Sequence, residues 1–257
     1  MLISVIIITL NEAENIEKTI MAVKKAAQTK LKPLIPIEIV VSDGGSSDKT
    51  VEIAKNLVDK VIVGSRGRYK QLNAGANASK GNILLFLHAD TLLPEGALLK
   101  IYFEMRSSKT VGGGFEKQWS WSPNLKLSKF LKTMCYIWKG FDNWAVRLLK
   151  TFPGDNAIFV RKAVYKQLKG FSPLWICEDF DFIKRLKRYK KKNIVYIRSA
   201  VLTSTRRFEK YGFFKIIVSW FFIYILWRLG MNQKRLRSLF DKYSTIPEPG
   251  NRKYLRF

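Results

Sequence analysis

The feature that most constrains this fold is the alternation of apolar strands with helical segments over the first ninety residues. Residues 2–8 and 37–41 are continuous aliphatic runs, the pattern of strands that are buried on both faces. Residues 11–26 place their apolar side chains on one helical face, with acids early and lysines late. The same order continues with strands at 58–63 and 82–87 around a helix at 68–78. This alternation predicts an α/β fold with a parallel sheet and right-handed crossovers.

Beyond residue 94 the periodicity is weaker, but it still predicts several elements. They are a helix at 98–105, a strand near 111–121, a short strand within 152–162, a basic helix that follows Cys177, and a partly ordered polar tail at 233–257. We expect residues 1–205 to form the main domain and residues 206–257 to form a basic, aromatic helical segment with a tail.

Polar side chains stand just past the ends of the predicted strands, where open parallel sheets bind ligands. They are Thr9, Asn11 and Glu12 after the first strand, Asp43 and Gly44 after the second, and His88 and Asp90 after the fourth. Three carboxylates therefore collect at one edge of the sheet. The first strand is not followed by a GxGxxG turn, which argues against a dinucleotide site.

Three of these residues have two interpretations each. Asp43 and its glycines can accept hydrogen bonds from a ligand that approaches the backbone, or they can form an ordinary strand-to-helix turn. Asp90 can hold a divalent cation beside a diphosphate, or it can cap a turn. His88, the only histidine, lies on the same side of the strand as Asp90 and can bind Mn²⁺. The alternative of a hydrogen-bonding core residue is favoured for a lone histidine at a strand end.

Further charged groups accompany the later helices. Glu178 and Asp179 begin the basic helix, where the helix dipole favours acids, and a carboxylate in a partly dry pocket can act as a general base. Arg68 at a helix start and the pair Arg206 and Arg207 suit phosphate oxygens, or they form a solvated basic face.

The chain carries 46 Lys and Arg against 20 Asp and Glu, a net charge of +26, and residues 184–257 hold twenty basic and three acidic residues. Such a cationic segment predicts an anionic partner. The apolar run Ile216–Trp227 is too short to span a bilayer; it suits a helix at a membrane interface or a buried helix that covers the core. A nucleic-acid-binding motif is not recognisable. The first residues are typical of a strand and not of a signal peptide, so we expect a cytoplasmic protein. Its basic, aromatic C-terminal half suits attachment to the cytoplasmic face of a membrane, as an alternative to packing on the core.

Taken together, these motifs resemble glycosyltransferase family 2, which has the A-type nucleotide-sugar-binding fold. The segment SVIIITLNEAENIEKTI is similar to the opening strand and helix of the family, and EIVVSDGGSSDKTVEIA is similar to its nucleotide-binding segment. GNILLFLHADTLLPEGAL resembles its metal-motif strand, and EDFDF its catalytic element. A radical-SAM-associated subgroup resembles the chain more closely, through GRYKQLNAGA, FLHADT, GDNAIFVRK and TSTRRFEKYG.

The resemblance implies a Rossmann-like sheet, a nucleotide-diphosphate-sugar donor of the UDP class, and Mn²⁺ or Mg²⁺. Asp90 would coordinate the metal, with His88 in place of the first acid of the family's DxD motif, and Asp179 beside Glu178 would deprotonate an acceptor hydroxyl for inverting transfer. The substrate-binding set implied in this way is Thr9, Asn11, Glu12, Asp43, Gly44, Arg68, Asp155, Arg206 and Arg207.

Two other functions remain as alternatives. A sugar-1-phosphate nucleotidyltransferase would carry a glycine-rich loop with arginine and lysine after the first strand, where this chain has TLNEAEN. A non-enzymatic binder of anionic membrane or nucleic acid would need no acids at the strand ends. The acids are present, so the sequence favours the glycosyltransferase, with an acceptor that it does not identify.

Overall fold

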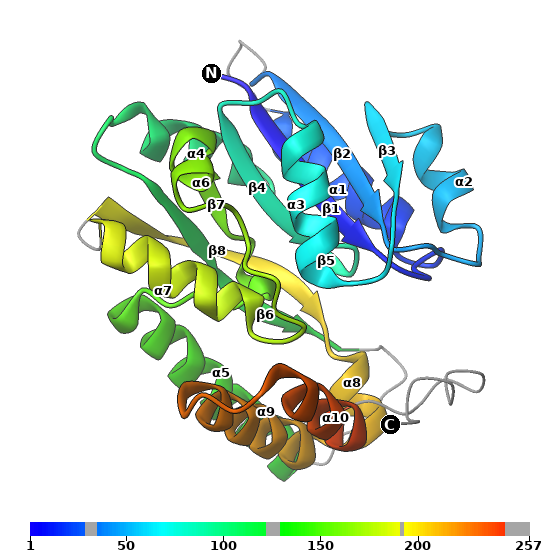
Figure 1. Cartoon of the computed structure of the whole chain (residues 1–257), viewed down its shortest axis with the longest axis vertical. Helices are drawn as coiled ribbons and strands as arrows, with labels where there is room; N and C mark the ends of the chain where they lie inside the picture. The colour runs from blue at the N-terminus through cyan, green and yellow to red at the C-terminus, as the bar shows by residue number, and fades with distance from the viewer. Residues whose placement is uncertain (29–34, 122–128, 191–192, 245–257) are drawn as a thin grey trace.

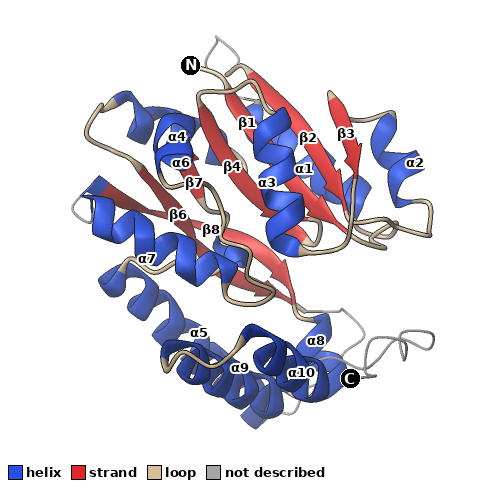
Figure 2. Cartoon of the chain, viewed as in Figure 1, coloured by secondary structure: helices blue, strands red, loops and turns tan. Residues whose placement is uncertain are grey.

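The computed structural model describes residues 1–28, 35–121, 129–190 and 193–244. Within them, one mixed sheet has helices packed against it (Figure 1). Its eight strands follow the order β3-β2-β1-β4-β7-β6-β8-β5 (Figure 2). The α/β class predicted from the sequence is therefore confirmed.

The first half of the sheet is parallel, as expected. Its strands are β1 (Ile3–Thr9), β2 (Ile37–Asp43), β3 (Lys60–Val63) and β4 (Ile83–His88). The helices between them are α1 (Ile16–Ala27), α2 (Thr50–Lys55) and α3 (Arg68–Ala78). All of β1 is buried because its alternate residues enter two cores: Val5 and Ile7 pack with α1, and Ile6 and Ile8 pack with α3.

The second half of the sheet is mixed. After β5 (Thr91–Leu92) and α4 (Ala97–Arg106) it contains β6 (Gly112–Ser120), β7 (Phe159–Arg161) and β8 (Ile194–Ser204). The short strand β7 is antiparallel to both β4 and β6, whereas β8 is parallel to β6. A Cβ on Gly113 would lie 2.2 Å from the Val195 carbonyl oxygen, so glycine permits this close strand pairing. The strand β8 was not predicted from the sequence; it follows a lysine run and contains Arg198 and Ser199.

Two further helices follow β7, and the second of them begins with the predicted site residues Glu178 and Asp179. The helix α6 (Lys162–Gln167) follows β7, and α7 (Glu178–Lys190) is the predicted basic helix. Phe182, Ile183 and Leu186 of α7 are fully buried in the core that also contains α3. Glu178 and Asp179 at the start of α7 are buried with these residues, whereas Arg188 and Lys190 near its end are exposed.

The C-terminal helices α8 (Arg206–Tyr211), α9 (Phe213–Arg228) and α10 (Gln233–Ser244) lie beside α5 (Lys129–Leu149), away from β1 to β3 (Figure 1). Phe208 packs 4.9 Å from Trp119 of β6, measured between ring centroids. This contact joins the C-terminal segment to the sheet; the boundary at residue 205 stays a prediction. The expected partly ordered tail is wrong for its first twelve residues, which form the amphipathic helix α10, and residues 245–257 lie outside the described part.

The helix α9, which contains the run Ile216–Trp227, has both buried and exposed apolar residues. Its buried residues are Phe213, Ile216 and Ile223. Its exposed large apolar residues are Phe214, Val218, Phe221, Phe222 and Ile225. Within the described residues, no helix combines the length and apolar character needed to cross a bilayer. A peripheral membrane location stays a prediction.

Candidate active site

The turn after β2 is built by the Asp43 carboxylate. Its Oδ1 accepts hydrogen bonds from the backbone N–H groups of Gly45 and Ser46, at 2.8 and 2.7 Å, and its Oδ2 accepts the Ser46 hydroxyl. Gly45 has a φ of +89°, a backbone conformation that glycine adopts without steric cost, and the hydrogen bond to Asp43 holds the turn in it. Asp43 therefore shapes the turn, which was one of its two interpretations, and its role toward a nucleotide stays a prediction.

The neighbouring strand end presents a buried polar atom. Thr9 Oγ1 is buried and has no hydrogen-bond partner among the described residues. The Gly44 N–H donates to the Thr9 carbonyl at 2.9 Å, and the amide of Gln71 donates to the same carbonyl at 2.7 Å. Asn11 stands in the left-handed region, and its Oδ1 accepts from the Ser47 N–H at 2.9 Å. The loops after β1 and β2 are thus held together by hydrogen bonds, and the Thr9 hydroxyl is a buried polar group whose partner the described residues do not supply.

Glu12, Asp90 and Arg206 form a strand-end cluster. Arg206 Nη1 donates to Glu12 Oε2 at 2.9 Å, its Nη2 contacts Glu12 Oε1, and Nη2 also lies 3.2 Å from Asp90 Oδ2. Hydrogen bonding with Glu12 raises the pKa of Arg206, whereas burial raises the pKa of Asp90 against the effect of Arg206. Two of the three predicted strand-end acids therefore meet at a single positive charge.

This arrangement allows a test of the metal that the family resemblance implies. Within the described residues, no three His, Cys, Asp or Glu side chains gather as a protein-only metal site requires. Mg²⁺ and Mn²⁺ are commonly held by one or two carboxylates together with substrate phosphates. Glu12 and Asp90 provide two such carboxylates around one cationic point, where the Arg206 guanidinium now lies. The residues fit a divalent cation that shares its coordination with a bound diphosphate.

Arg68, Glu178 and Asp179 form a second, helix-start cluster. Arg68 Nε pairs with Glu178 Oε1 at 2.8 Å, and Arg68 Nη2 lies 3.8 Å from Asp179 Oδ2. Glu178 is fully buried, and burial raises its pKa to about 7 although Arg68 opposes the shift. Asp179 Oδ2 accepts the Gly154 N–H at 2.6 Å, and its Oδ1 accepts the Phe180 N–H at 2.7 Å. These bonds fix the orientation of the Asp179 carboxylate.

His88 joins this second cluster. Its Nε2 lies 3.3 Å from Arg68 Nη2, and a guanidinium can only donate, so Nε2 accepts and Nδ1 carries the proton. Burial, followed by the charge of Arg68, lowers the pKa of His88 to about 3, and the ring is therefore neutral at pH 7. The contact supports the hydrogen-bonding alternative, and the metal-binding role of His88 stays a prediction.

Asp155 lies on the short helix η1 (Gly154–Asn156), where it pairs with Lys117, a residue that was not predicted from the sequence to belong to the site. Lys117 is buried on β6, and its Nζ lies 3.1 Å from Asp155 and 3.0 Å from Asp142. Burial alone would lower the pKa of Lys117, but the two carboxylates outweigh it and raise that pKa. The burial of Lys117 could have been predicted from its spacing in the strand: it lies two residues from both Phe115 and Trp119, so it shares their buried face.

Arg207 is the remaining predicted cation. It is held over the ring of Phe240 on α10, 6.0 Å from the ring centroid. Burial, together with the positive charge of Arg68, lowers the pKa of Arg207, while Asp90 and Asp155 act in the opposite direction. The charge of Arg207 therefore interacts with charged residues of both clusters.

Comparison with known proteins gives a match over the segment that contains most of these strands and loops. The sequence model of the family described as Glycosyl transferase family 2 matches residues 4–168, more than half of the chain. The chain belongs to this family. The glycosyltransferase AglE of Haloferax volcanii is 40% identical over 95 residues, which cover 34% of this chain and 30% of AglE. The chain thus spans less than a third of that relative, and the likeness to the radical-SAM-associated subgroup stays a prediction.

Solved structures show the same A-type fold. TarS of Staphylococcus aureus (residues 1–349), in complex with UDP, has a TM-score of 0.59 at 16% identity and covers 95% of this chain and 70% of its own. Glucosyl-3-phosphoglycerate synthase of Mycobacterium tuberculosis has a TM-score of 0.59 at 16% identity, with coverage of 90% and 80%. That structure contains Mn²⁺, UDP and glucosyl-3-phosphoglycerate. At such identities the likeness shows the fold.

Proposed function

We propose that this family 2 glycosyltransferase moves a sugar from a nucleotide-diphosphate-sugar of the UDP class to an acceptor hydroxyl, with inversion. The observation that carries the proposal is the placement of the two clusters. One presents Glu12 and Asp90 to a single cationic point, and the other holds the Asp179 carboxylate in a fixed orientation. Because His88 and Asp90 both follow the apolar body of β4, the clusters are adjacent through that strand end.

The donor would bind over the loops after β1 and β2. The buried hydroxyl of Thr9 lacks a partner among the described residues, and Gly45 in the Asp43 turn is exposed. The complexes of the structural neighbours with UDP and with UDP-GlcNAc support a donor of this class. Arg206 and Arg207 would then face the diphosphate, which suits their charge.

A divalent cation would be held by Asp90 and Glu12, with His88 as a further candidate. When bound, such a cation neutralises charge that develops on the leaving diphosphate. The neighbouring synthase was solved with Mn²⁺ and with Mg²⁺, which supports the same type of ion here.

Asp179 would remove the proton from the acceptor hydroxyl. Its Oδ2 accepts the Gly154 N–H at 2.6 Å, and Arg68 Nη2 lies 3.8 Å from the same oxygen. A base on the side of the anomeric carbon opposite the leaving group gives a single displacement, and therefore inversion. Glu178 is fully buried and would act through Arg68, as a positioning residue.

A donor panel tests this proposal. The purified protein is incubated with UDP-, GDP- and dTDP-sugars, with and without Mn²⁺, and released products are identified by mass spectrometry. We expect a nucleoside diphosphate to be released, slowly to water in the absence of acceptor, and Asp179→Asn to reduce that rate by about 10²–10⁴-fold while leaving UDP binding intact. Pyrophosphate release would instead identify a nucleotidyltransferase. If no nucleotide sugar is bound or turned over, the proposal fails.

A further inference from the structure

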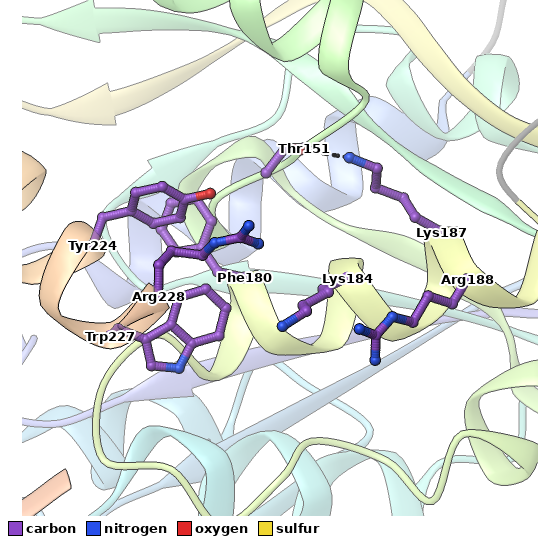
Figure 3. A pocket seen from close by; sticks show the side chains of 8 residues that line it. All are labelled: Thr151, Phe180, Lys184, Lys187, Arg188, Tyr224, Trp227 and Arg228. Carbon is purple, nitrogen blue, oxygen red and sulfur yellow. Dashed lines mark hydrogen bonds between the residues drawn. The ribbon is translucent and has the colours of Figure 1, made fainter. Parts of the chain in front are cut away.

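A hollow lies between α7 and α9, outside both clusters. It has a volume of about 290 Å³. Eight residues line it: Thr151, Phe180, Lys184, Lys187, Arg188, Tyr224, Trp227 and Arg228. Figure 3 shows Tyr224, Trp227 and Arg228 on one side, with the lysines and arginine of α7 on the other.

The lining is strongly cationic. Four of the eight residues are lysine or arginine, and none is acidic. Lys187 Nζ donates to Thr151 Oγ1 at 3.2 Å, so its ammonium is held toward the loop that precedes Gly154. Cations that share one concave site repel each other unless an anion neutralises them. A ligand with two negative charges on one group fits this requirement.

The opposite wall is aromatic. The ring centroids of Phe180 and Tyr224 are 5.0 Å apart, and those of Tyr224 and Trp227 are 5.9 Å apart. Lys184 Nζ lies 5.6 Å from the centroid of Trp227. An aromatic wall beside cations suits a ligand that carries a sugar ring or a hydrocarbon next to its charged group.

Two chain segments connect this hollow with the helix-start cluster. Phe180 directly follows Asp179 on α7, and Thr151 stands three residues before Gly154, whose N–H binds Asp179. A helix rises about 1.5 Å and turns about 100° per residue, so Lys184 lies about 7.5 Å farther along α7 than Asp179 and about 140° around its axis. A molecule held in the hollow therefore has to pass Phe180, beside the loop from Thr151 to Gly154, for another part of it to reach Asp179.

We propose that this hollow binds the phosphate-ester group of the acceptor, while an acceptor hydroxyl extends to Asp179. The inference rests on the proposed function and adds the substrate class to it. The phosphate ester has two sources that share this chemistry. One is a soluble sugar phosphate, and the other is a lipid phosphate, for which the exposed Phe221 and Phe222 on α9 offer an adjoining apolar surface.

The test measures binding to the full chain by calorimetry, with UDP present at saturation so that the donor site is filled. Glucose 6-phosphate represents the soluble source, and farnesyl phosphate, which has no hydroxyl outside its phosphate, probes only whether the hollow binds a lipid phosphate; glucose and farnesol are their uncharged counterparts. We expect at least one phosphate ester to bind, and its counterpart to bind at least tenfold more weakly. The double variant Lys184→Ala/Arg228→Ala should lose at least about tenfold in affinity.

A matched double variant, Lys55→Ala/Arg106→Ala, removes the same charge from exposed positions on α2 and α4. It should bind the phosphate ester within about twofold of the wild type, because net charge alone contributes little at physiological salt. Lys184→Arg, which keeps the charge, should retain binding. Unchanged binding in the Lys184/Arg228 variant, with its circular dichroism spectrum intact, overturns the inference.

The same titrations separate this inference from the proposed function. If UDP binds but neither phosphate ester binds in its presence, the acceptor inference fails and the glycosyltransferase proposal stands. If UDP itself does not bind, the proposed function fails, and the hollow is then no acceptor site. Preference for glucose 6-phosphate or for farnesyl phosphate supports the inference and identifies the source.

Discussion

The strand-end cluster and the helix-start cluster use the same chemistry, an arginine between two acids, in different surroundings. The Arg206 side chain is 50% exposed, and its acids Glu12 and Asp90 retain some exposure. In the other cluster Glu178 has no exposure at all. Charges in water exchange partners at little cost, whereas buried charges stay paired. The comparison indicates that the first cluster is built to admit a ligand and the second to hold one geometry.

The clusters also differ in how the chain supplies their arginines. Arg206 begins α8, in the C-terminal segment, and it meets Glu12 across 194 positions of sequence. Arg68 begins α3 within the parallel half of the sheet, where helix and strands share a core. The strand-end cluster therefore depends on how α8 is placed, which the Phe208–Trp119 contact with β6 sets, whereas Arg68 is placed by the core of the parallel half.

The largest expected difference concerns stability. Arg68→Ala leaves Glu178 buried without its counter-charge, and we expect the free energy of unfolding to fall by about 2–3 kcal/mol. Arg206→Ala should cost at most about 1 kcal/mol, because its pairs are partly solvated. Urea denaturation measures both. The double variant Arg68→Ala/Glu178→Gln should recover much of the loss, and equal losses for the two arginines would contradict the comparison.

A second prediction concerns a substitution, Gly154→Ala, that displaces residues of the helix-start cluster without removing a charge. A Cβ on Gly154 would lie 2.8 Å from His88 Nε2 and 2.9 Å from Arg68 Nη2, closer than real contacts allow. These groups must shift, and because small misplacements of reacting groups are costly, we expect Gly154→Ala to lower kcat by about 10–100-fold. Steady-state kinetics with the accepted donor measures this.

Gly140 is the matched control for that substitution. A Cβ there meets no atom within 4 Å, and the residue lies on α5. Gly140→Ala should leave kcat unchanged and should slightly stabilise the helix. A Gly154→Ala variant with normal kcat would show that the cluster tolerates displacement, against the fixed geometry proposed for it.

The third prediction concerns pH and the buried acid. Burial raises the pKa of Glu178 from 4.5 to about 7 in the folded protein. The folded state therefore binds more protons than the unfolded state between these values, and its stability falls as pH rises through this window. Urea denaturation at pH 5 and pH 7.5 should show this decrease. Glu178→Gln should reduce it, whereas the exposed Glu104→Gln should not.

The sequence predicted the parallel half of the fold well, because strands buried on both faces leave continuous apolar runs. The helix predicted at 68–78 coincides with α3. The strand β8 was missed because only some of its residues are buried, so polar residues interrupt its pattern. The helix α10 was not predicted because few of its residues are apolar: Leu236 is fully buried, but most of its other side chains are polar or charged.

The site was predicted less completely, for a physical reason. Sequence order placed Glu12 and Asp90 at the same sheet edge, since parallel strands end together. It could not show that Arg206 would pair with both, because that contact depends on how α8 folds back. Nor could it place Lys117 beside Asp155, or His88 beside Arg68, since these pairs join different elements.

The smallest expected effect tests whether Arg206 and a cation compete for the same acids. Removing the guanidinium frees Glu12 and Asp90, so Arg206→Ala should bind Mn²⁺ about three- to fivefold more tightly in the absence of nucleotide, within the roughly 1 kcal/mol of an exposed ion pair. Electron paramagnetic resonance titration of free Mn²⁺ measures this affinity. Arg235→Ala removes an exposed arginine of α10 and should change nothing. Weaker Mn²⁺ binding by Arg206→Ala would instead show that the arginine supports the ion, and the strand-end cluster would then be as fixed as the helix-start cluster.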